Sequence, residues 1–187
     1  MKKTLIFGAA TALALTTMAP TVASAAVTGS PKTSEADVTL DEGNLDLTKV
    51  PSFTFGTINA GVASDLKAAP KEDQQLTVTN AGVMTGWNVT VSATAFTDGT
   101  NTLTLKGAAL SLEAGTPTSD STDGVPTAKA VAINDKENSV FSAAAGQGLG
   151  EWVNKLGDGQ ARLVIPSGSQ PGSYKSTLTW TLTDAPA

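Results

Sequence analysis

Apolar and polar residues alternate along short segments of this chain, and this alternation is the pattern of a β-strand with one buried face. The longest example lies near the C-terminus, where one face is mostly apolar and the other mostly hydroxylated. The first face consists of Tyr174, Ser176, Leu178, Trp180 and Leu182, and the second of Lys175, Thr177, Thr179, Thr181 and Thr183. An earlier segment places Trp87, Val89 and Val91 opposite Asn88, Thr90 and Ser92. Each segment predicts a strand that packs one face on a core and exposes the other to solvent.

Similar segments, separated by Gly, Asn, Asp and Pro, follow one another along most of the chain, and its 28 threonines favour strands over helices. The segments predicted as strands are Asp37–Leu47, Ser52–Phe55, Gln75–Thr79, Trp87–Phe96, Asn101–Leu105, Ala108–Leu112, Lys129–Ile133, Ala161–Ile165 and Tyr174–Thr183. We therefore expect an all-β fold, a single antiparallel β-sandwich of Ig-like or jelly-roll type, in which the Trp87 and Trp180 strands lie close together.

Two segments do not fit the strand pattern. Residues 115–127 contain almost nothing apolar and predict a long exposed loop. Residues 139–152 combine an alanine run with Gly146, Gly148 and Gly150, which predicts a loop with room for a short helical turn.

The N-terminus carries the layout of a secretory signal peptide. Lys2 and Lys3 precede an apolar stretch over residues 5–18, which Pro20 ends, and Ala23–Ala25 offers the small-x-small site that a signal peptidase cleaves. A membrane anchor is the alternative, but the stretch is shorter than the ~20 residues that a spanning helix needs. The chain is expected to divide into a signal peptide (1–25), a flexible lead-in (26–37) and a sandwich domain (38–187).

Cleavage after Ala25 predicts a mature chain that begins at Ala26. Mass spectrometry of protein recovered from the cell surface should show this start or a start one residue later. Recovery of an intact chain beginning at Met1 from the wall fraction would contradict the assignment.

Charge and cysteine content narrow the ways in which the mature chain attaches to a surface. Cleavage removes Lys2 and Lys3 and no acid, which leaves 10 basic and 17 acidic side chains, a net charge of −7. This balance argues against binding to nucleic acid or to an anionic membrane. The chain has no cysteine, so neither disulfides nor a cysteine-linked lipid is available. Attachment is expected to be non-covalent, with no membrane insertion after cleavage.

The residues needed for most catalytic and metal sites are missing. Without His or Cys, neither a nucleophile-histidine site nor an ordinary zinc site can form. The 17 acids include no pair that the sequence singles out for glycan hydrolysis. Asp120–Gly124 and Asp135–Asn138 are rich in oxygen ligands but lack the spacing of a calcium loop, and they fit turns better. We expect no enzyme activity, metal or cofactor.

The tryptophans have two interpretations. A tryptophan in a sandwich strand is most often a core residue, but it can also be a platform on which a sugar ring stacks. Trp87 and Trp180 both lie on the apolar face of their strands, and alternation favours the core without excluding the platform.

The end of the chain resembles a known family. Residues 174–186, YKSTLTWTLTDAP, match all six fixed positions of the distal motif of the WxL domain, Y-x-x-x-L-T-W-x-L-x-x-x-P. Residues 86–91, GWNVTV, resemble its proximal motif, with Val89 where leucine is commoner. Phe53–Gly56 and the glycine-rich segment before Trp152 fit the same layout. Thr79–Gly82 departs from it, since family members often carry an Asp and an Arg-Gly there.

This resemblance implies a secreted module held non-covalently on the Gram-positive cell wall, with peptidoglycan as its target. It also implies assembly with other surface proteins encoded nearby, so the alternative is a structural subunit that docks on such a protein through a strand edge. The motif residues expected to form or support the binding site are Trp87, Val89, Tyr174, Leu178, Thr179, Trp180, Thr181, Leu182 and Pro186.

Overall fold

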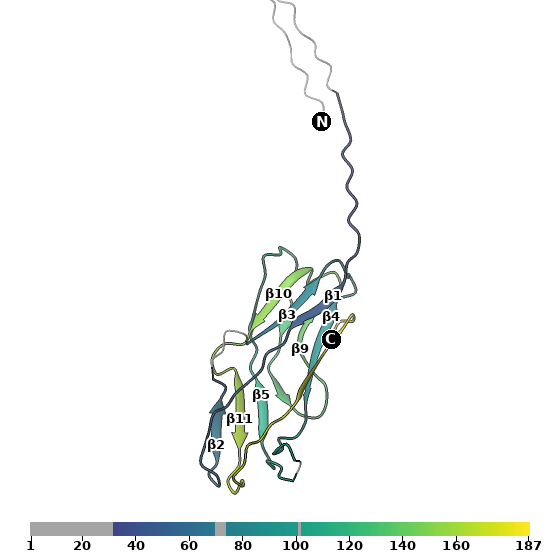
Figure 1. Cartoon of the computed structure of the whole chain (residues 1–187). Helices are drawn as coiled ribbons and strands as arrows, with labels where there is room; N and C mark the ends of the chain where they lie inside the picture. Colours follow the sequence, from purple (N-terminus) through teal and green to yellow (C-terminus); the bar gives the residue numbers. More distant parts are fainter. Residues whose placement is uncertain (1–31, 70–73, 101) are drawn as a thin grey trace, which may run out of the picture. The chain divides into compact units, whose positions relative to one another are not determined.

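A computed structural model describes residues 32–69, 74–100 and 102–187 in two units (Figure 1). The described residues of the first unit, 32–38, are exposed and belong to no strand. The second unit, Thr39–Ala187, is compact and holds twelve strands. No helix occurs among the described residues, so none of them forms a helix long and apolar enough to cross a bilayer. The signal peptide, its cleavage site and the predicted start at Ala26 lie outside the described residues, as does Asn101.

The strands form three sheets of four strands, and every pair within them is antiparallel. The first sheet has the order β1 (Leu45–Lys49), β3 (Gln75–Asn80), β10 (Gly150–Lys155) and β6 (Thr116–Thr118). The second has the order β2 (Ser64–Lys67), β11 (Ala161–Ile165), β5 (Ala109–Leu112) and β8 (Val131–Ile133). The third has the order β12 (Leu178–Thr183), β4 (Trp87–Ala93), β9 (Asn138–Ala143) and β7 (Thr127–Ala128). The predicted all-β antiparallel sandwich is confirmed.

Alternation along the strands produces the core. In β11, Ala161, Leu163 and Ile165 are buried while Arg162 and Val164 are exposed. The same alternation buries the predicted apolar face of β4. The largest fully buried side chains are Trp87, Phe141, Leu76, Val78, Val89, Val91 and Asn80. The fold is therefore held by the inner faces of strands that come from the whole length of the compact unit.

One exposed ion pair joins two strands of the second sheet. The guanidinium of Arg162 on β11 donates hydrogen bonds to the carboxylate of Asp65 on β2. This hydrogen bond from Arg162 holds the pKa of Asp65 below its ordinary value. Because both side chains are about half exposed, the pair contributes little to stability.

Several predicted elements were wrong. The strand predicted over Asp37–Leu47 begins only at Leu45, because the described residues before Gly43 make no backbone hydrogen bond with another described segment. Ser52–Phe55 alternates as a strand does but belongs to no sheet, although its two phenylalanines pack against the core. In addition, β2 forms over Ser64–Lys67, a segment that was not predicted as a strand. Other boundaries shifted: β4 ends at Ala93 and β12 begins at Leu178.

The two segments predicted as loops also contain strands. Residues 115–127 include the short strand β6 and the first residue of β7. Residues 139–152 include most of β9 and the start of β10, with no helical turn. In β9, Phe141, Ser142 and Ala143 are buried beside β4. The pairing with β4 supplies the hydrogen bonds that stabilise this segment of small residues as a strand. The β-propensity of the segment itself does not indicate that such a partner exists.

Candidate functional site

The two strands that carry the tryptophan motifs lie side by side in the third sheet. β12 pairs with β4 along its full length, with Trp180 opposite Val91 and Leu182 opposite Val89. Directly opposed residues in an antiparallel pair point to the same face of the sheet. The apolar residues of both motifs therefore share the inner face, and the expected proximity of the two strands is confirmed.

Trp87 is a core residue. Its side chain is 0% exposed and its ring meets Phe141 edge-on, with the centroids 4.8 Å apart and the planes at 76°. Its indole N–H donates a hydrogen bond of 3.2 Å to the carbonyl of Gly148. The indole N–H of Trp152 donates a hydrogen bond of 3.0 Å to the carbonyl of the next residue, Leu149. Both indoles thus fix the glycine-rich segment before β10, and neither ring is available to stack on a ligand.

Trp180 occupies a different position. It lies on the inner face of β12, an edge strand, and it is half-buried and packed against the core. Leu178 and Leu182, its neighbours on that face, are half-buried as well. Trp180 therefore covers the margin of the core instead of its centre.

The outer face of the same strands forms a continuous polar surface, which we call the hydroxyl face. Thr179, Thr181 and Thr183 on β12 lie opposite Ser92, Thr90 and Asn88 on β4, and Thr90 lies opposite Ser139 on β9. No residue of this set is charged. The row of threonines predicted to face outward on the last strand is thus part of a polar surface that extends over β12, β4 and β9. Ser139 was missed because its segment was predicted as a loop.

The hydrogen bonds of the hydroxyl face leave several groups unused. Ser139 and Asn88 are joined by a side-chain hydrogen bond of 2.6 Å, and the Thr183 hydroxyl donates to the Asn88 carbonyl at 3.3 Å. The hydroxyl of Thr90 is buried and has no partner among the described residues. The hydroxyls of Thr179 and Thr181 also make no hydrogen bond within the described chain. A ligand laid across this face could exchange hydrogen bonds with the hydroxyls of Thr179 and Thr181, whereas the buried hydroxyl of Thr90 lies out of its reach.

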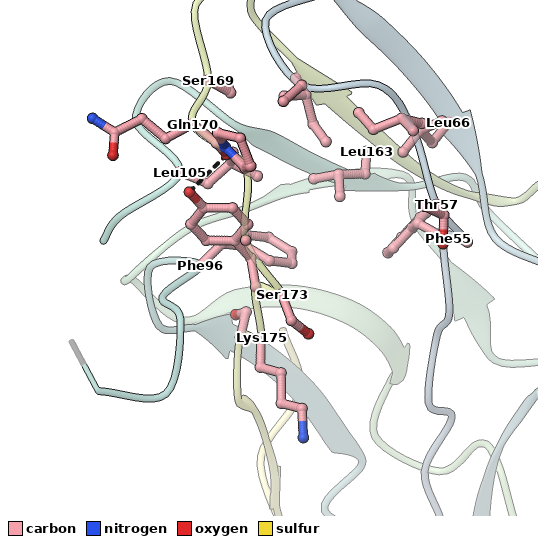
Figure 2. A pocket seen from close by; sticks show the side chains of 18 of the residues that line it. Phe55, Thr57, Leu66, Phe96, Leu105, Leu163, Ser169, Gln170, Ser173 and Lys175 are labelled. Carbon is pink, nitrogen blue, oxygen red and sulfur yellow. Dashed lines mark hydrogen bonds between the residues drawn. The ribbon is translucent and has the colours of Figure 1, made fainter. Parts of the chain in front are cut away.

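The remaining motif residues lie elsewhere. Tyr174 and Leu178 line a cavity of about 730 Å³, which we call the aromatic groove (Figure 2). The phenol of Tyr174 donates a hydrogen bond of 3.0 Å to the carbonyl of Gln170. Pro186 follows the end of β12 and is exposed. The structure therefore brings Trp87, Val89, Leu178, Thr179, Trp180, Thr181 and Leu182 together on β4 and β12, and it leaves Tyr174 and Pro186 outside these two strands.

The aromatic groove also collects three phenylalanines that sequence reasoning did not assign to a site. Phe53, Phe55 and Phe96 line it together with Tyr174. In Figure 2, Phe55 lies across the groove from Phe96. The alternation Phe53-Thr54-Phe55 is the one feature of the sequence that points to the groove, but it predicts a strand. Lys175 is the one charged residue among the described residues of its lining.

Comparison with known proteins decides the family. The family model of the WxL domain, described as a surface cell wall-binding domain, matches residues 16–186. The chain belongs to the WxL domain family. No curated protein and no solved structure gave a match. The WxL assignment makes this protein a module of the bacterial cell surface that binds the cell wall. Within the part of the WxL domain that the structure describes, no three His, Cys, Asp or Glu side chains gather as a metal site.

Proposed function

We propose that this WxL domain holds the protein on the cell wall by binding peptidoglycan through the hydroxyl face. One observation carries the proposal: the paired motif strands place their tryptophans inward and a row of uncharged hydroxyl and amide groups outward. Peptidoglycan offers sugar hydroxyls, N-acetyl groups and peptide amides, all of which exchange hydrogen bonds with such groups. In this proposal the tryptophans support the binding surface from behind.

The double variant Thr179→Val/Thr181→Val is expected to bind purified peptidoglycan sacculi about 5- to 150-fold more weakly. The substitution removes two hydroxyls but keeps their shape and β-propensity, and a lost hydrogen bond costs about 0.5–1.5 kcal/mol. A sedimentation assay with washed sacculi, with and without teichoic acids, measures the change.

The matched control is Thr104→Val/Thr116→Val, which alters two exposed threonines outside the hydroxyl face. We expect both double variants to unfold at the wild-type midpoint and only the first to lose binding. Full binding by the folded Thr179→Val/Thr181→Val variant would exclude the hydroxyl face as the site.

Raising the salt concentration to about 1 M is expected to leave most of the protein bound. The screening length falls to ~3 Å at that concentration, which weakens charge attraction but not the contacts of an uncharged face. Denaturant should release the protein. Complete elution by salt alone, followed in wall fractions, would show that a charged surface makes the attachment.

The alternative function is docking onto another surface protein. It is favoured by the position of β12, which is paired with β4 on one side and is an edge of its sheet on the other. An exposed edge offers unpaired backbone groups to a strand of a partner. Binding to bare sacculi supports the wall-binding proposal, and binding only to walls that keep their other surface proteins supports docking.

A further inference from the structure

The residues before β1 have the pattern of a strand but belong to no sheet. Over residues 35–41, Ala36, Val38 and Leu40 alternate with acidic and hydroxyl residues. Val38 and Leu40 are 83% and 85% exposed, more than any other large apolar side chain in the described chain. No described segment pairs with residues 35–41, which we call the donor segment. Apolar side chains on one face of an unpaired extended segment indicate a surface that is covered in another state.

The aromatic groove lies between two segments that are mostly outside the sheets. One wall is residues 53–62 and the other is residues 169–178, while the floor is formed by core residues such as Leu163 and Ile165. At one end the walls are joined by backbone hydrogen bonds of Gly61 with the segment at 168–169. Between residues 55 and 60, no backbone hydrogen bond ties the first wall to the rest of the described chain. This wall therefore offers free N–H and C=O groups beside an apolar floor.

We propose that the aromatic groove binds the donor segment of a second copy of this protein as an added strand. The three apolar side chains of the donor segment span about 14 Å in extended form, and they would face the floor of the groove. The backbone of the donor segment would pair with the free groups of residues 57–59, which lie between Gly56 with its positive φ and the turn at Ala60 and Gly61. Charge supports this occupant: the described lining of the groove includes Lys175 and no acid, and Glu35, Asp37 and Asp41 flank the apolar side chains.

The occupant comes from another molecule because the same molecule holds Leu40 too far away. The amide of Gly43 donates to the carbonyl of Ala81, just after β3, which fixes the chain there. From Gly43, Leu40 extends at most about 11 Å. Thr54, where the groove begins, lies near the opposite end of β3, where its carbonyl accepts from Ala69. The six residues of β3 separate these two points by about 20 Å.

Each copy carries one donor segment and one groove, so the contact is heterologous and copies join head to tail. The processed protein should form a concentration-dependent series of oligomers in sedimentation velocity. The variant Val38→Asp/Leu40→Asp should be monomeric at the same concentrations and unfold at the wild-type midpoint, because both side chains are exposed in the single molecule. A monomeric wild-type protein up to about millimolar concentration would overturn the proposal.

The absence of cysteine from the chain allows the contact to be trapped. We expect Leu40→Cys protein mixed with Thr57→Cys protein to form a disulfide-linked heterodimer under mild oxidation, since Thr57 lies in the groove wall (Figure 2). The matched control mixes Leu40→Cys with Thr116→Cys, on β6 away from the groove, and should give no enrichment of heterodimer. Equal yields in the two mixtures would overturn the assignment of the groove. A disulfide within one molecule carrying both Leu40→Cys and Thr57→Cys at high dilution would overturn the second copy as occupant.

Discussion

The variant Trp87→Ala is expected to lose about 3–5 kcal/mol of unfolding free energy, the largest effect of any single truncation in this domain. The ring is 0% exposed, packs edge-on against Phe141 and donates its N–H to Gly148. Its removal leaves a cavity between β4 and β9 and frees the glycine-rich segment before β10. Because a domain of this kind is stable by about 5–15 kcal/mol, the loss is a large fraction of the total. Denaturant unfolding followed by circular dichroism measures it.

Trp180→Ala is the matched comparison, because it removes the same side chain from a half-buried position at the margin of the core. We expect about half the loss seen for Trp87→Ala, and unchanged binding to sacculi at temperatures where the variant is folded. A folded Trp180→Ala protein that fails to bind would place the ligand on the tryptophan side. Equal losses for the two variants would contradict the difference in burial.

Gly148→Ala is expected to destabilise the domain by about 2–5 kcal/mol. Gly148 has φ of +74°, and an added Cβ would lie 2.5 Å from the Cβ of Ala143 and 2.7 Å from the indole nitrogen of Trp87. The left-handed backbone costs an alanine about 1–2 kcal/mol, and forced overpacking costs about 1–3 kcal/mol more. Displacement of the indole also weakens its hydrogen bond. Thermal unfolding monitored by tryptophan fluorescence reports both effects.

Gly99→Ala separates backbone strain from the steric clash. Gly99 has φ of +84°, close to that of Gly148, but apart from its chain neighbours no described residue lies within 4 Å of the position of an added Cβ. We expect a loss of only about 1–2 kcal/mol. If the two glycine variants were equally stable, the close approach of Gly148 to Trp87 would not exist in solution.

The sequence was informative wherever alternation coincided with burial. The strands β3, β4, β11 and β12 were predicted nearly in place, because each has an apolar face that meets the core. Alternation did not predict β9. Its Ser142 and Ala143 are buried, although small residues of this kind do not indicate a core strand. Alternation failed in the opposite direction for Ser52–Phe55 and for the residues before Leu45, which alternate without any strand beside them. Whether such a segment becomes a strand depends on its pairing with a distant segment. The local sequence does not show which segment that partner is.

The candidate site shows the same limit. Alternation placed Trp87 and Trp180 on the apolar faces of their strands, but it did not distinguish a central core residue from one at the margin. The threonines of β12 were predicted to face outward, whereas the width of the hydroxyl face depends on the register of β12 on β4 and of β4 on β9. The motif pattern groups Tyr174 with Trp180, although the fold directs Tyr174 into the aromatic groove.

The position of β12 in the chain has a consequence for biogenesis. Thr183 hydrogen-bonds with Asn88, 95 residues earlier, so this edge of β4 stays open until β12 has been synthesised. During export, a chain that has emerged only as far as β11 exposes the apolar side of Val89 and Val91 and an unpaired strand. Such intermediates aggregate and are cut by proteases far more readily than the closed domain. The edge of β4 that pairs with β12 is therefore covered only once β12 has also been translocated.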